Sequence, residues 1–296
     1  MFFNGAYAEY LLKQKFTFES LTIMENIFRP KIAIAFYSIT RSLKYTINSI
    51  QENIINQAKC AGDIKVYSHF YKQDVISNPR TNESATIDPD EWKLLNSDVN
   101  CIEEIDDDTE KELFNKIIQY GNSWEDSGES LRNILRQLSS LHKVTRLIEN
   151  DGDFDLVIFA RPDMCYHDIF PIQDFIKNIK ENTLAVPNWA WSGGLNDRFA
   201  ICGSEAFKIY GYRADRLIDY CRTKKKPMHS ERLLMFAVQT STSQLMTTSL
   251  RATRIRANGV PAVENFTRIK IAKRIEAYLL CNVIPTFNRI KNIFLA

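Results

Sequence analysis

Two strand-like runs with a helix-length segment between them constrain the fold of this chain more than any other feature. Residues 31–38, KIAIAFYS, form a dense apolar run, and residues 63–71, DIKVYSHFY, form a second one. The segment between them carries apolar residues at helical spacing, namely Leu43, Ile47, Ile50, Ile54 and Ile55. A strand, a helix and a strand in this order predict parallel pairing through a right-handed crossover.

The same alternation continues along the chain. Residues 129–152 show a helical apolar stripe and lead directly into FDLVIFA, residues 154–160. Further strand-like runs follow at 183–189 and 198–202, with helical segments at 204–223 and from Ser230 onward. A late strand is expected within LRATRIRANGV, residues 250–260. Strands alternating with helices predict an α/β fold with a mainly parallel sheet.

One long segment breaks the pattern. Residues 73–110 are polar and contain Pro79 and Pro89, and they include the acidic cluster EEIDDD at 103–108. We interpret this cluster as a solvated loop that leads into the next helix, because helix N-termini favour carboxylates.

Charge and cysteine usage exclude several classes of protein. Lys and Arg total 38 against 36 Asp and Glu, a formal charge of +2, so nothing demands a nucleic-acid partner. The six cysteines show no CxxC or CxH spacing, which signals neither a zinc site nor a disulfide framework and fits a reducing cytoplasm. No signal peptide or 18-residue apolar span is recognisable, so we expect a soluble protein that at most attaches to a membrane surface.

Ligands of open α/β sheets bind beyond the carboxyl ends of the strands. Three loops follow predicted strands there: SITRS at 38–42, SHFYK at 68–72 and ARPDM at 160–164. In the third, Pro162 stiffens the backbone between Arg161 and Asp163. A carboxylate there suits Mg or Mn, and the arginine suits a phosphate. The alternative is an Arg–Asp ion pair that caps the strand end.

Three segments of the chain resemble a known family. FDLVIFARPDM, VPNWAWSGGLNDRFAICGSEAF and HSERLL resemble a group of bacterial and viral polysaccharide-assembly proteins with a glycosyltransferase type A (GT-A) fold. In that group a strand ends in Arg-x-Asp, a Gly-Gly-x-Asn-Asp-Arg-Phe loop follows, and a glutamate begins a later helix. The resemblance covers residues 31–260. It implies a Rossmann-like three-layer sandwich, with helical extensions at 1–30 and 261–296.

The resemblance also implies a donor site. Asp163 matches the aspartate that holds a divalent cation, Mn or Mg, on the diphosphate of a nucleotide-sugar. Arg161 replaces the first acidic residue of that motif, which puts strict metal dependence in doubt. Around them we expect further donor contacts: Ser38, Thr40 and Arg41 at the base and ribose, His69 and Tyr71 as walls of the base, and Lys143 at a phosphate. Each is equally well interpreted as a cap, a packing aromatic or a surface lysine.

The loop GGLNDRFA, residues 193–200, supplies the catalytic candidates. Gly194 allows a close ligand approach, and Asn196 adds a polar ligand contact. We expect Asp197 to act as the base that deprotonates the acceptor hydroxyl, and Glu231 to lie near one of the sugars. Alternatively, Asp197 stabilises a turn and Glu231 is a helix N-terminal carboxylate.

Two apolar features remain open to two interpretations. Trp189 and Trp191 either stack on a sugar or belong to the core. The C-terminal segment 268–296 combines six Lys and Arg residues with apolar ones, so it either lies in a membrane interface or packs on the catalytic domain or the N-terminal helix.

The resemblance therefore implies a glycosyltransferase that acts in surface polysaccharide synthesis. It would move a sugar from a nucleotide-diphosphate sugar to a hydroxyl of an oligosaccharide or lipid-linked glycan, in the cytoplasm or at the inner face of a membrane. The alternatives are a catalytically weak nucleotide- or glycan-binding assembly subunit, and a metal-dependent nucleotidyltransferase.

Overall fold

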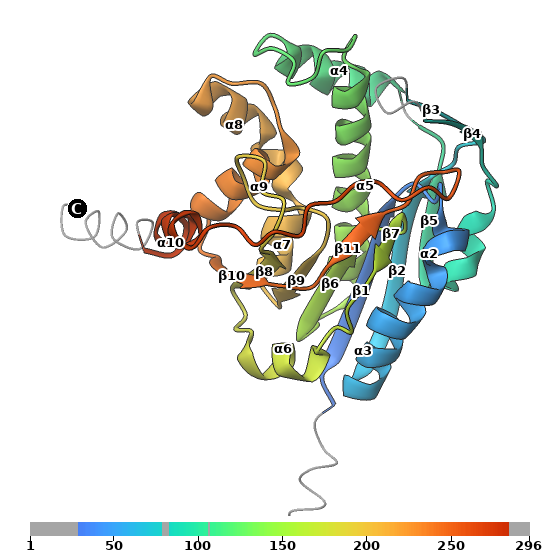
Figure 1. Cartoon of the computed structure of the whole chain (residues 1–296), viewed down its shortest axis with the longest axis vertical. Coiled ribbons are helices and arrows are strands. Elements are labelled where there is room, and N and C mark those ends of the chain that lie inside the picture. The colour runs from blue at the N-terminus through green and yellow to red at the C-terminus, as the bar shows by residue number, and fades with distance from the viewer. Residues whose placement is uncertain (1–28, 79–82, 106, 284–296) are drawn as a thin grey trace, which may run out of the picture.

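A seven-stranded sheet organises the chain (Figure 1). The computed structural model describes residues 29–78, 83–105 and 107–283, so the helical extension expected at 1–30 falls almost wholly outside the described residues. The strand order is β10-β8-β9-β6-β1-β2-β5. These strands are β1 Lys31–Ser38, β2 Asp63–Tyr71, β5 Val99–Glu103, β6 Leu156–Ala160, β8 Thr183–Pro187, β9 Ala200–Gly203 and β10 Gln244–Thr248.

The sheet is mainly parallel, as predicted. β1 pairs in parallel with both β2 and β6, β2 with β5, and β8 with β10. Only β9 among these strands runs antiparallel, to β6 and to β8. The chain passes from β8 to β9 through a loop without a crossover helix, and parallel pairing would need such a crossover.

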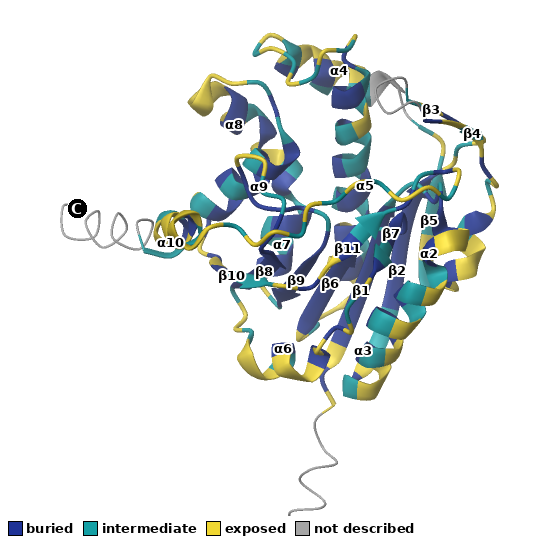
Figure 2. Ribbon diagram, viewed as in Figure 1, coloured by how far each residue is buried: buried dark blue, intermediate teal, exposed yellow. Residues whose placement is uncertain are grey.

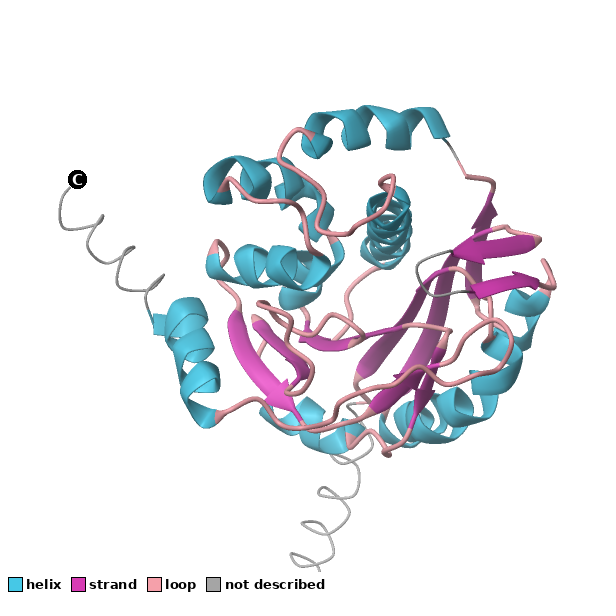
Figure 3. Ribbon diagram, turned by 45° about the horizontal axis from the view of Figure 1, so that its top comes forward, coloured by secondary structure: helices cyan, strands magenta, loops and turns pink. Residues whose placement is uncertain are grey.

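Helices cover both faces of the sheet, which makes three layers (Figures 2 and 3). In β1, Ile32, Ile34 and Phe36 face one side, and the alternate residues face the other. The first side packs against α2 Leu43–Ile50, the π-helical turn Gln51–Ile55, α3 Asn56–Ala61 and α6 Ile172–Asn178. The second packs against α5 Glu129–Asp151, α7 Ala206–Gly211 and α9 Ser230–Gln239.

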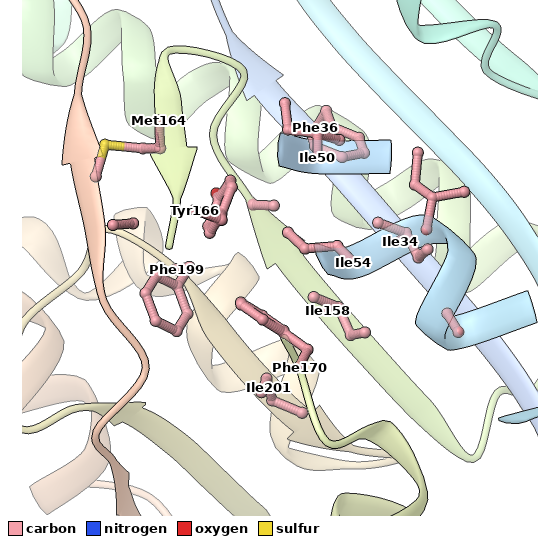
Figure 4. Packing of buried hydrophobic residues seen from close by; sticks show 14 of the residues in the cluster. Ile34, Phe36, Ile50, Ile54, Ile158, Met164, Tyr166, Phe170, Phe199 and Ile201 are labelled. Atoms are coloured by element: carbon pink, nitrogen blue, oxygen red, sulfur yellow. The ribbon is translucent and has the colours of Figure 1, made fainter. Parts of the chain in front are cut away.

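The first core runs along one face of β1 and β6 and reaches β7, which follows the turn after β6 (Figure 4). Tyr166 makes edge contacts with the rings of Phe170 and Phe199 there. Its hydroxyl accepts a hydrogen bond of 2.9 Å from the backbone N–H of Arg161. This aromatic packing therefore anchors the turn that follows β6.

Smaller elements complete the described chain. A third apolar cluster joins α5 and α9 to α4 Asp107–Ile118 and α8 Leu217–Lys224. Two small antiparallel pairs flank the sheet, β3 Val75–Asn78 with β4 Glu83–Thr86, and β7 Met164–Tyr166 with β11 Ala252–Arg254. Short 3-10 turns span Glu91–Leu95 and Arg213–Arg216.

Two segments differ from the sequence interpretation. The polar region 73–110 contains three short strands, and Glu103, which was expected in a solvated loop, ends strand β5; the helix that the acidic cluster was expected to precede begins at Asp107. These strands are four or five residues long, too short for a clear alternation of apolar and polar residues. The late strand expected within 250–260 is only the three residues of β11, and β10 precedes it.

Part of the C-terminal segment packs on the catalytic domain, and the membrane contact stays a prediction. Helix α10, Ile271–Tyr278, continues into a π-helical turn, Leu279–Val283. Ala277 and Cys281 are buried against the second face of the sheet, whereas Ile271 and Ile275 are exposed. Across the described residues, no helix combines the length and apolar character needed to span a bilayer.

Candidate functional site

Two adjoining cavities open at the carboxyl ends of β1, β2 and β6. The first, which we name the cationic cavity, has a volume of about 330 Å³, and its walls include Ser38, Arg41, Tyr71, Arg136, Arg161 and Arg254. The second, the carboxylate cavity, has a volume of about 190 Å³, and its walls include Trp124, Asp197, Arg198, His229 and Glu231. Gln137, Arg161 and Arg254 line both cavities. The two therefore form neighbouring compartments of one site.

Asp163 lies beneath the cationic cavity, buried among guanidinium groups. Its Oδ1 accepts a hydrogen bond of 2.9 Å from Arg161 Nε, and its Oδ2 accepts bonds of 2.7 Å from Arg161 Nη2 and 2.6 Å from Arg41 Nη2. Burial alone would raise the pKa of Asp163, but Arg161 and Arg41 hold it well below its usual range. The Arg161–Asp163 ion pair, which was the alternative interpretation of the sequence, is present, and Arg41 is a second arginine in it.

Arg254 brings a further positive charge to the same place. Burial and the charge of Arg161 lower the pKa of Arg254 to about 10, so it remains protonated at neutral pH. Arg161 also donates from Nη1 to Oε1 of Gln137 at 2.9 Å, which fixes its guanidinium between the two cavities. Three arginines thus surround a single aspartate.

This arrangement does not fit a divalent cation at Asp163. Both carboxylate oxygens already accept hydrogen bonds from arginines, and a metal ion there would face the positive charges of Arg41, Arg161 and Arg254. Mg and Mn bind where several oxygen ligands converge, and the described residues provide only this one carboxylate at the position. The predicted metal role of Asp163 stays a prediction without support from its contacts.

A second buried carboxylate holds the outer arginines. Glu83 of β4 faces Arg41 Nη1 at 3.5 Å and Arg256 Nη1 at 3.2 Å. Its Oε1 also accepts a hydrogen bond of 2.8 Å from the backbone N–H of Ala257. Glu83 therefore holds Arg41 at Nη1, while Asp163 holds it at Nη2.

Asp197 is buried in an ion-paired and hydrogen-bonded setting. Ser230 Oγ donates to Asp197 Oδ2, and Nη2 of the fully buried Arg213 lies 3.5 Å from the same oxygen. Tyr210 donates from its hydroxyl to the backbone carbonyl of Asp197 at 2.8 Å. Asp197 is held rigidly by these groups at the wall of the carboxylate cavity.

Glu231 has the electrostatics of a general base. Its Oε2 accepts a hydrogen bond of 2.7 Å from the backbone N–H of Ser192, and Arg198 Nη1 lies 3.8 Å from Oε1. Burial, together with the negative charge of Asp197, raises the pKa of Glu231 to about 7. A carboxylate with a pKa near neutrality can accept a proton and release it again at the working pH.

The glycine loop positions these carboxylates through its backbone. The N–H of Leu195 donates to the carbonyl of Glu231 at 3.0 Å, and a Cβ on Gly194 would lie 2.1 Å from that carbonyl oxygen. Asn196 is buried, and it donates from Nδ2 to the carbonyl of Trp189 at 2.8 Å. The close approach of the backbone to the start of α9 thus requires a glycine at position 194, and the ligand contact expected there stays a prediction.

Three predicted donor contacts surround the end of β1. Ser38 and Arg41 line the cationic cavity, and Ser38 has a φ of 96°, a strained value for a residue with a side chain. Its N–H donates to Ser140 Oγ at 2.7 Å. Tyr71 also lines the cavity, while Thr40 is buried, with its carbonyl accepting a bond from the N–H of Leu43.

His69 and Lys143 lie apart from the cavity walls. His69 is fully buried, and Lys143 forms an ion pair with Glu103 at the end of β5. Neither is among the described residues that line the cationic cavity. Trp189 belongs to the core, whereas Trp191 is half-buried and lines a separate cavity beside α9.

Sequence reasoning missed Glu83, Gln137, Arg213 and Arg254. Glu83 and Arg254 reach the site from segments interpreted as loop or late strand, and Gln137 lies on the long helix α5. The alternating arginines of RATRIR were the one visible signal for Arg254.

A larger cavity of about 640 Å³ lies at the opposite edge, beside Lys31, Asp153 and Asp155. These residues lie at the N-terminal ends of β1 and β6, where open α/β sheets do not place their ligands. We therefore assign the candidate site to the carboxyl edge.

Comparison with known proteins yields only distant structural similarities. No protein-family model and no curated protein matches the sequence. Solved structures with a related chain course include apo glycosyltransferase GlyE of Streptococcus pneumoniae TIGR4, with 10% identity and a TM-score of 0.37 over 74% of this chain and 45% of that one. The apo form of mouse xyloside xylosyltransferase 1 shows 8% identity and a TM-score of 0.36, over 70% of this chain and 80% of that one.

The galactosyltransferase LgtC, in complex with donor and acceptor sugar analogs, shows 9% identity and a TM-score of 0.39 over 70% of both chains. The chain spans less than half of the length of GlyE. Because these structural similarities are so weak, no residue of this chain is assigned a role by correspondence with those structures.

Proposed function

We propose that the protein is a glycosyltransferase of the GT-A type, which uses a nucleotide-diphosphate sugar as donor and a hydroxyl group of a glycan as acceptor. The observation that carries this proposal is the shared wall of the two cavities. Arg161 and Arg254 line both a cationic compartment and a compartment that contains Asp197 and Glu231. One compartment suits a diphosphate, and the other suits a base beside a reacting hydroxyl.

The arginines would neutralise the donor in place of a metal ion. Arg41, Arg161, Arg254 and Arg256 carry four positive charges, and Asp163 and Glu83 cancel two of them. The remaining charge matches a diphosphate, which guanidinium groups bind through paired hydrogen bonds. Ser38 and Tyr71, at the other walls of the cationic cavity, are then placed to meet the nucleoside.

In the transfer step, Glu231 would take the proton of the acceptor hydroxyl. The acceptor oxygen forms a bond to the anomeric carbon of the donor while the bond from that carbon to the diphosphate oxygen breaks. The bonding electrons leave with the nucleoside diphosphate, whose charge faces Arg161 and Arg254. Asp197 stays a candidate for the base, but its bonds to Ser230 and its contact with Arg213 favour a positioning role.

The acceptor would be an oligosaccharide or a lipid-linked glycan. Exposed Ile271 and Ile275 on α10, beside Lys270 and Lys273, would suit the surface of an anionic membrane on which a lipid-linked acceptor lies. Co-sedimentation with anionic vesicles tests this contact. Replacing both isoleucines with serine should abolish it while leaving transfer to a soluble acceptor unchanged.

The decisive experiment measures release of nucleoside diphosphate from a panel of UDP-, GDP- and TDP-sugars, with Mn or with EDTA. We expect one donor to be hydrolysed or transferred at similar rates under both conditions. Binding of a nucleotide-sugar without turnover would favour a binding subunit instead. Turnover that is lost in EDTA and restored by Mn but not by Zn²⁺ would contradict the arginine site, and release of pyrophosphate from a nucleoside triphosphate would indicate a nucleotidyltransferase.

A further inference from the structure

A histidine, a cysteine and a glutamate meet at the ends of β2 and β5, outside the two cavities. His69 and Cys101 are partners in the parallel pairing of these strands, and Glu103 follows two residues later on the same face. His69 Nε2 lies 3.6 Å from Glu103 Oε2, and Cys101 Sγ lies 3.4 Å from Glu103 Oε1. The three ligand atoms all lie within 4.8 Å of one another.

The hydrogen bonds of Ser140 determine the tautomer of His69. Ser140 Oγ donates its only proton to the carbonyl of His69 at 2.8 Å, so it can only accept at its contact of 2.9 Å with Nδ1. Nδ1 therefore carries the ring proton, and Nε2 presents a lone pair. Metal-binding histidines are commonly oriented in this way by a bond from the other ring nitrogen.

That lone pair has no hydrogen-bond partner although His69 is fully buried. Nε2 faces the carboxylate of Glu103, and two acceptors facing each other repel unless a cation lies between them. A buried polar atom without a partner costs free energy. The unsatisfied nitrogen thus points to a missing electrophile.

The separations are close to those around a tetrahedral metal ion. Zinc bonds of about 2.0 Å to nitrogen and oxygen and about 2.3 Å to sulfur imply separations of about 3.3 Å for N···O and 3.5 Å for S···O. Here Nε2 lies 3.6 Å from one carboxylate oxygen of Glu103 and Sγ lies 3.4 Å from the other, so a rotation of the carboxylate would bring one oxygen toward both. A thiolate and an imidazole favour zinc over Mg or Mn, which prefer oxygen ligands.

Lys143 is the competing cation. Its Nζ donates to Glu103 Oε2, and both side chains are about one third exposed, at 36% and 37%. The lysine can therefore leave toward solvent when a metal ion arrives. Removal of its charge should strengthen metal binding, the opposite of what removal of a ligand does.

We propose that His69 Nε2, Cys101 Sγ and the Glu103 carboxylate form a zinc site, with a solvent water as fourth ligand. Cys101 binds as the thiolate, and its proton passes to solvent. The site links the end of β2 to β5 directly beside Tyr71. The ring centroids of Tyr71 and His69 lie 5.1 Å apart, in an edge-to-face arrangement. Zinc bound here would restrict the motion of Tyr71, which lines the cationic cavity, whether or not a metal ion binds the donor.

The test titrates the tag-free, chelator-stripped full chain with Zn²⁺ alone by calorimetry, and with Co²⁺ as a spectroscopic probe. We expect one ion per chain and a thiolate-to-cobalt charge-transfer band. Cys101→Ser should remove the band and weaken zinc binding by about 10-fold or more. Cys60→Ser, the same substitution at an exposed cysteine, should leave both unchanged.

Two further variants keep the result interpretable. Lys143→Met should bind zinc more tightly than wild type, and Glu103→Gln more weakly, with circular dichroism confirming that each is folded. The proposal is overturned if wild type binds no zinc at micromolar concentration, if Cys101→Ser binds as tightly as wild type, or if Lys143→Met weakens binding as Glu103→Gln does. Sugar-transfer activity is not needed for any of these readouts.

Discussion

The guanidinium of Arg161 holds the carboxylate of Asp163 in a paired contact, with Nε–Oδ1 at 2.9 Å and Nη2–Oδ2 at 2.7 Å. Arg41 reaches the same Oδ2 from the loop after β1. The aspartate thus serves to orient two arginines at the edge of the sheet. Arg254, which lines both cavities, adds charge that Asp163 does not balance.

Arg254→Gln should weaken binding of the donor nucleotide-sugar by about 10- to 150-fold, since hydrogen bonds to charged groups contribute about 1.5–3 kcal/mol. Calorimetric titration in the presence of EDTA measures this directly. Arg251→Gln is the matched control, because Arg251 is an exposed arginine that pairs with Asp168. Equal affinity of the two variants for the donor would show that Arg254 does not bind it.

Transfer activity should rise with pH through about pH 7, because Glu231 must be deprotonated to act as base and its pKa is raised to about 7 by burial and by Asp197. Glu231→Gln should lower kcat by about 100-fold or more while leaving donor affinity nearly unchanged. A pH–rate profile of wild type and steady-state kinetics of the variant check both points. A flat profile between pH 5.5 and 8 would exclude this role.

Glu231→Gln should also stabilise the fold at high pH. The folded chain keeps the Glu231 proton up to about pH 7, whereas the unfolded chain releases it near the ordinary value of 4.5. Between these values the folded state binds more protons, so the wild type loses stability as pH rises. The stability advantage of the variant should therefore grow from pH 5 to pH 8, by up to about 3 kcal/mol in the free energy of unfolding. Measurement of Tm for both proteins at the two pH values checks this. An equal advantage at both pH values would contradict the raised pKa.

Asp197→Ala should destabilise the fold by about 3 kcal/mol, because it leaves the guanidinium of the fully buried Arg213 without its carboxylate. Urea unfolding measures the change. Asp219→Ala, which removes an exposed partner of Arg222, should change stability by less than about 0.5 kcal/mol. If the two variants are equally stable, Asp197 does not balance Arg213. Because Asp197→Ala is expected to destabilise the fold, Asp197→Asn is the better variant for kinetic study, since it keeps a polar group at the position.

Gly194→Ala should reduce both stability and activity, because the added methyl group would lie 2.1 Å from the backbone oxygen of Glu231 and displace the start of α9. Gly193→Asn is the control. Gly193 has a φ of 79°, which asparagine adopts more readily than other residues with a side chain, and the three atoms nearest to a Cβ there belong to the side chain of Arg232. Thermal unfolding and transfer rates of the two variants should separate. Similar losses in both would indicate loop strain and not displacement of Glu231.

Much of the sheet could be predicted because its central strands are continuous apolar runs. In β1 and β6, residues of both faces are buried, and such runs stand out in a sequence. The edge strand β5 is polar and only partly buried, and its pairing with β2 could not be inferred from composition. The direction of β9 depends on how the loop before it is routed, which no local pattern encodes.

The sequence by itself determined a mainly parallel α/β sheet and the approximate positions of Arg161, Asp163, Asp197 and Glu231 at strand and helix ends. Only the tertiary structure decided their partners: Arg41 stands 122 residues from Asp163, and Ser230 stands 33 from Asp197. It likewise brought together His69, Cys101 and Glu103, whose spacing signals no metal site. Local patterns record which residues prefer a strand or a helix, whereas charge balance and ligand geometry arise only where distant segments pack together.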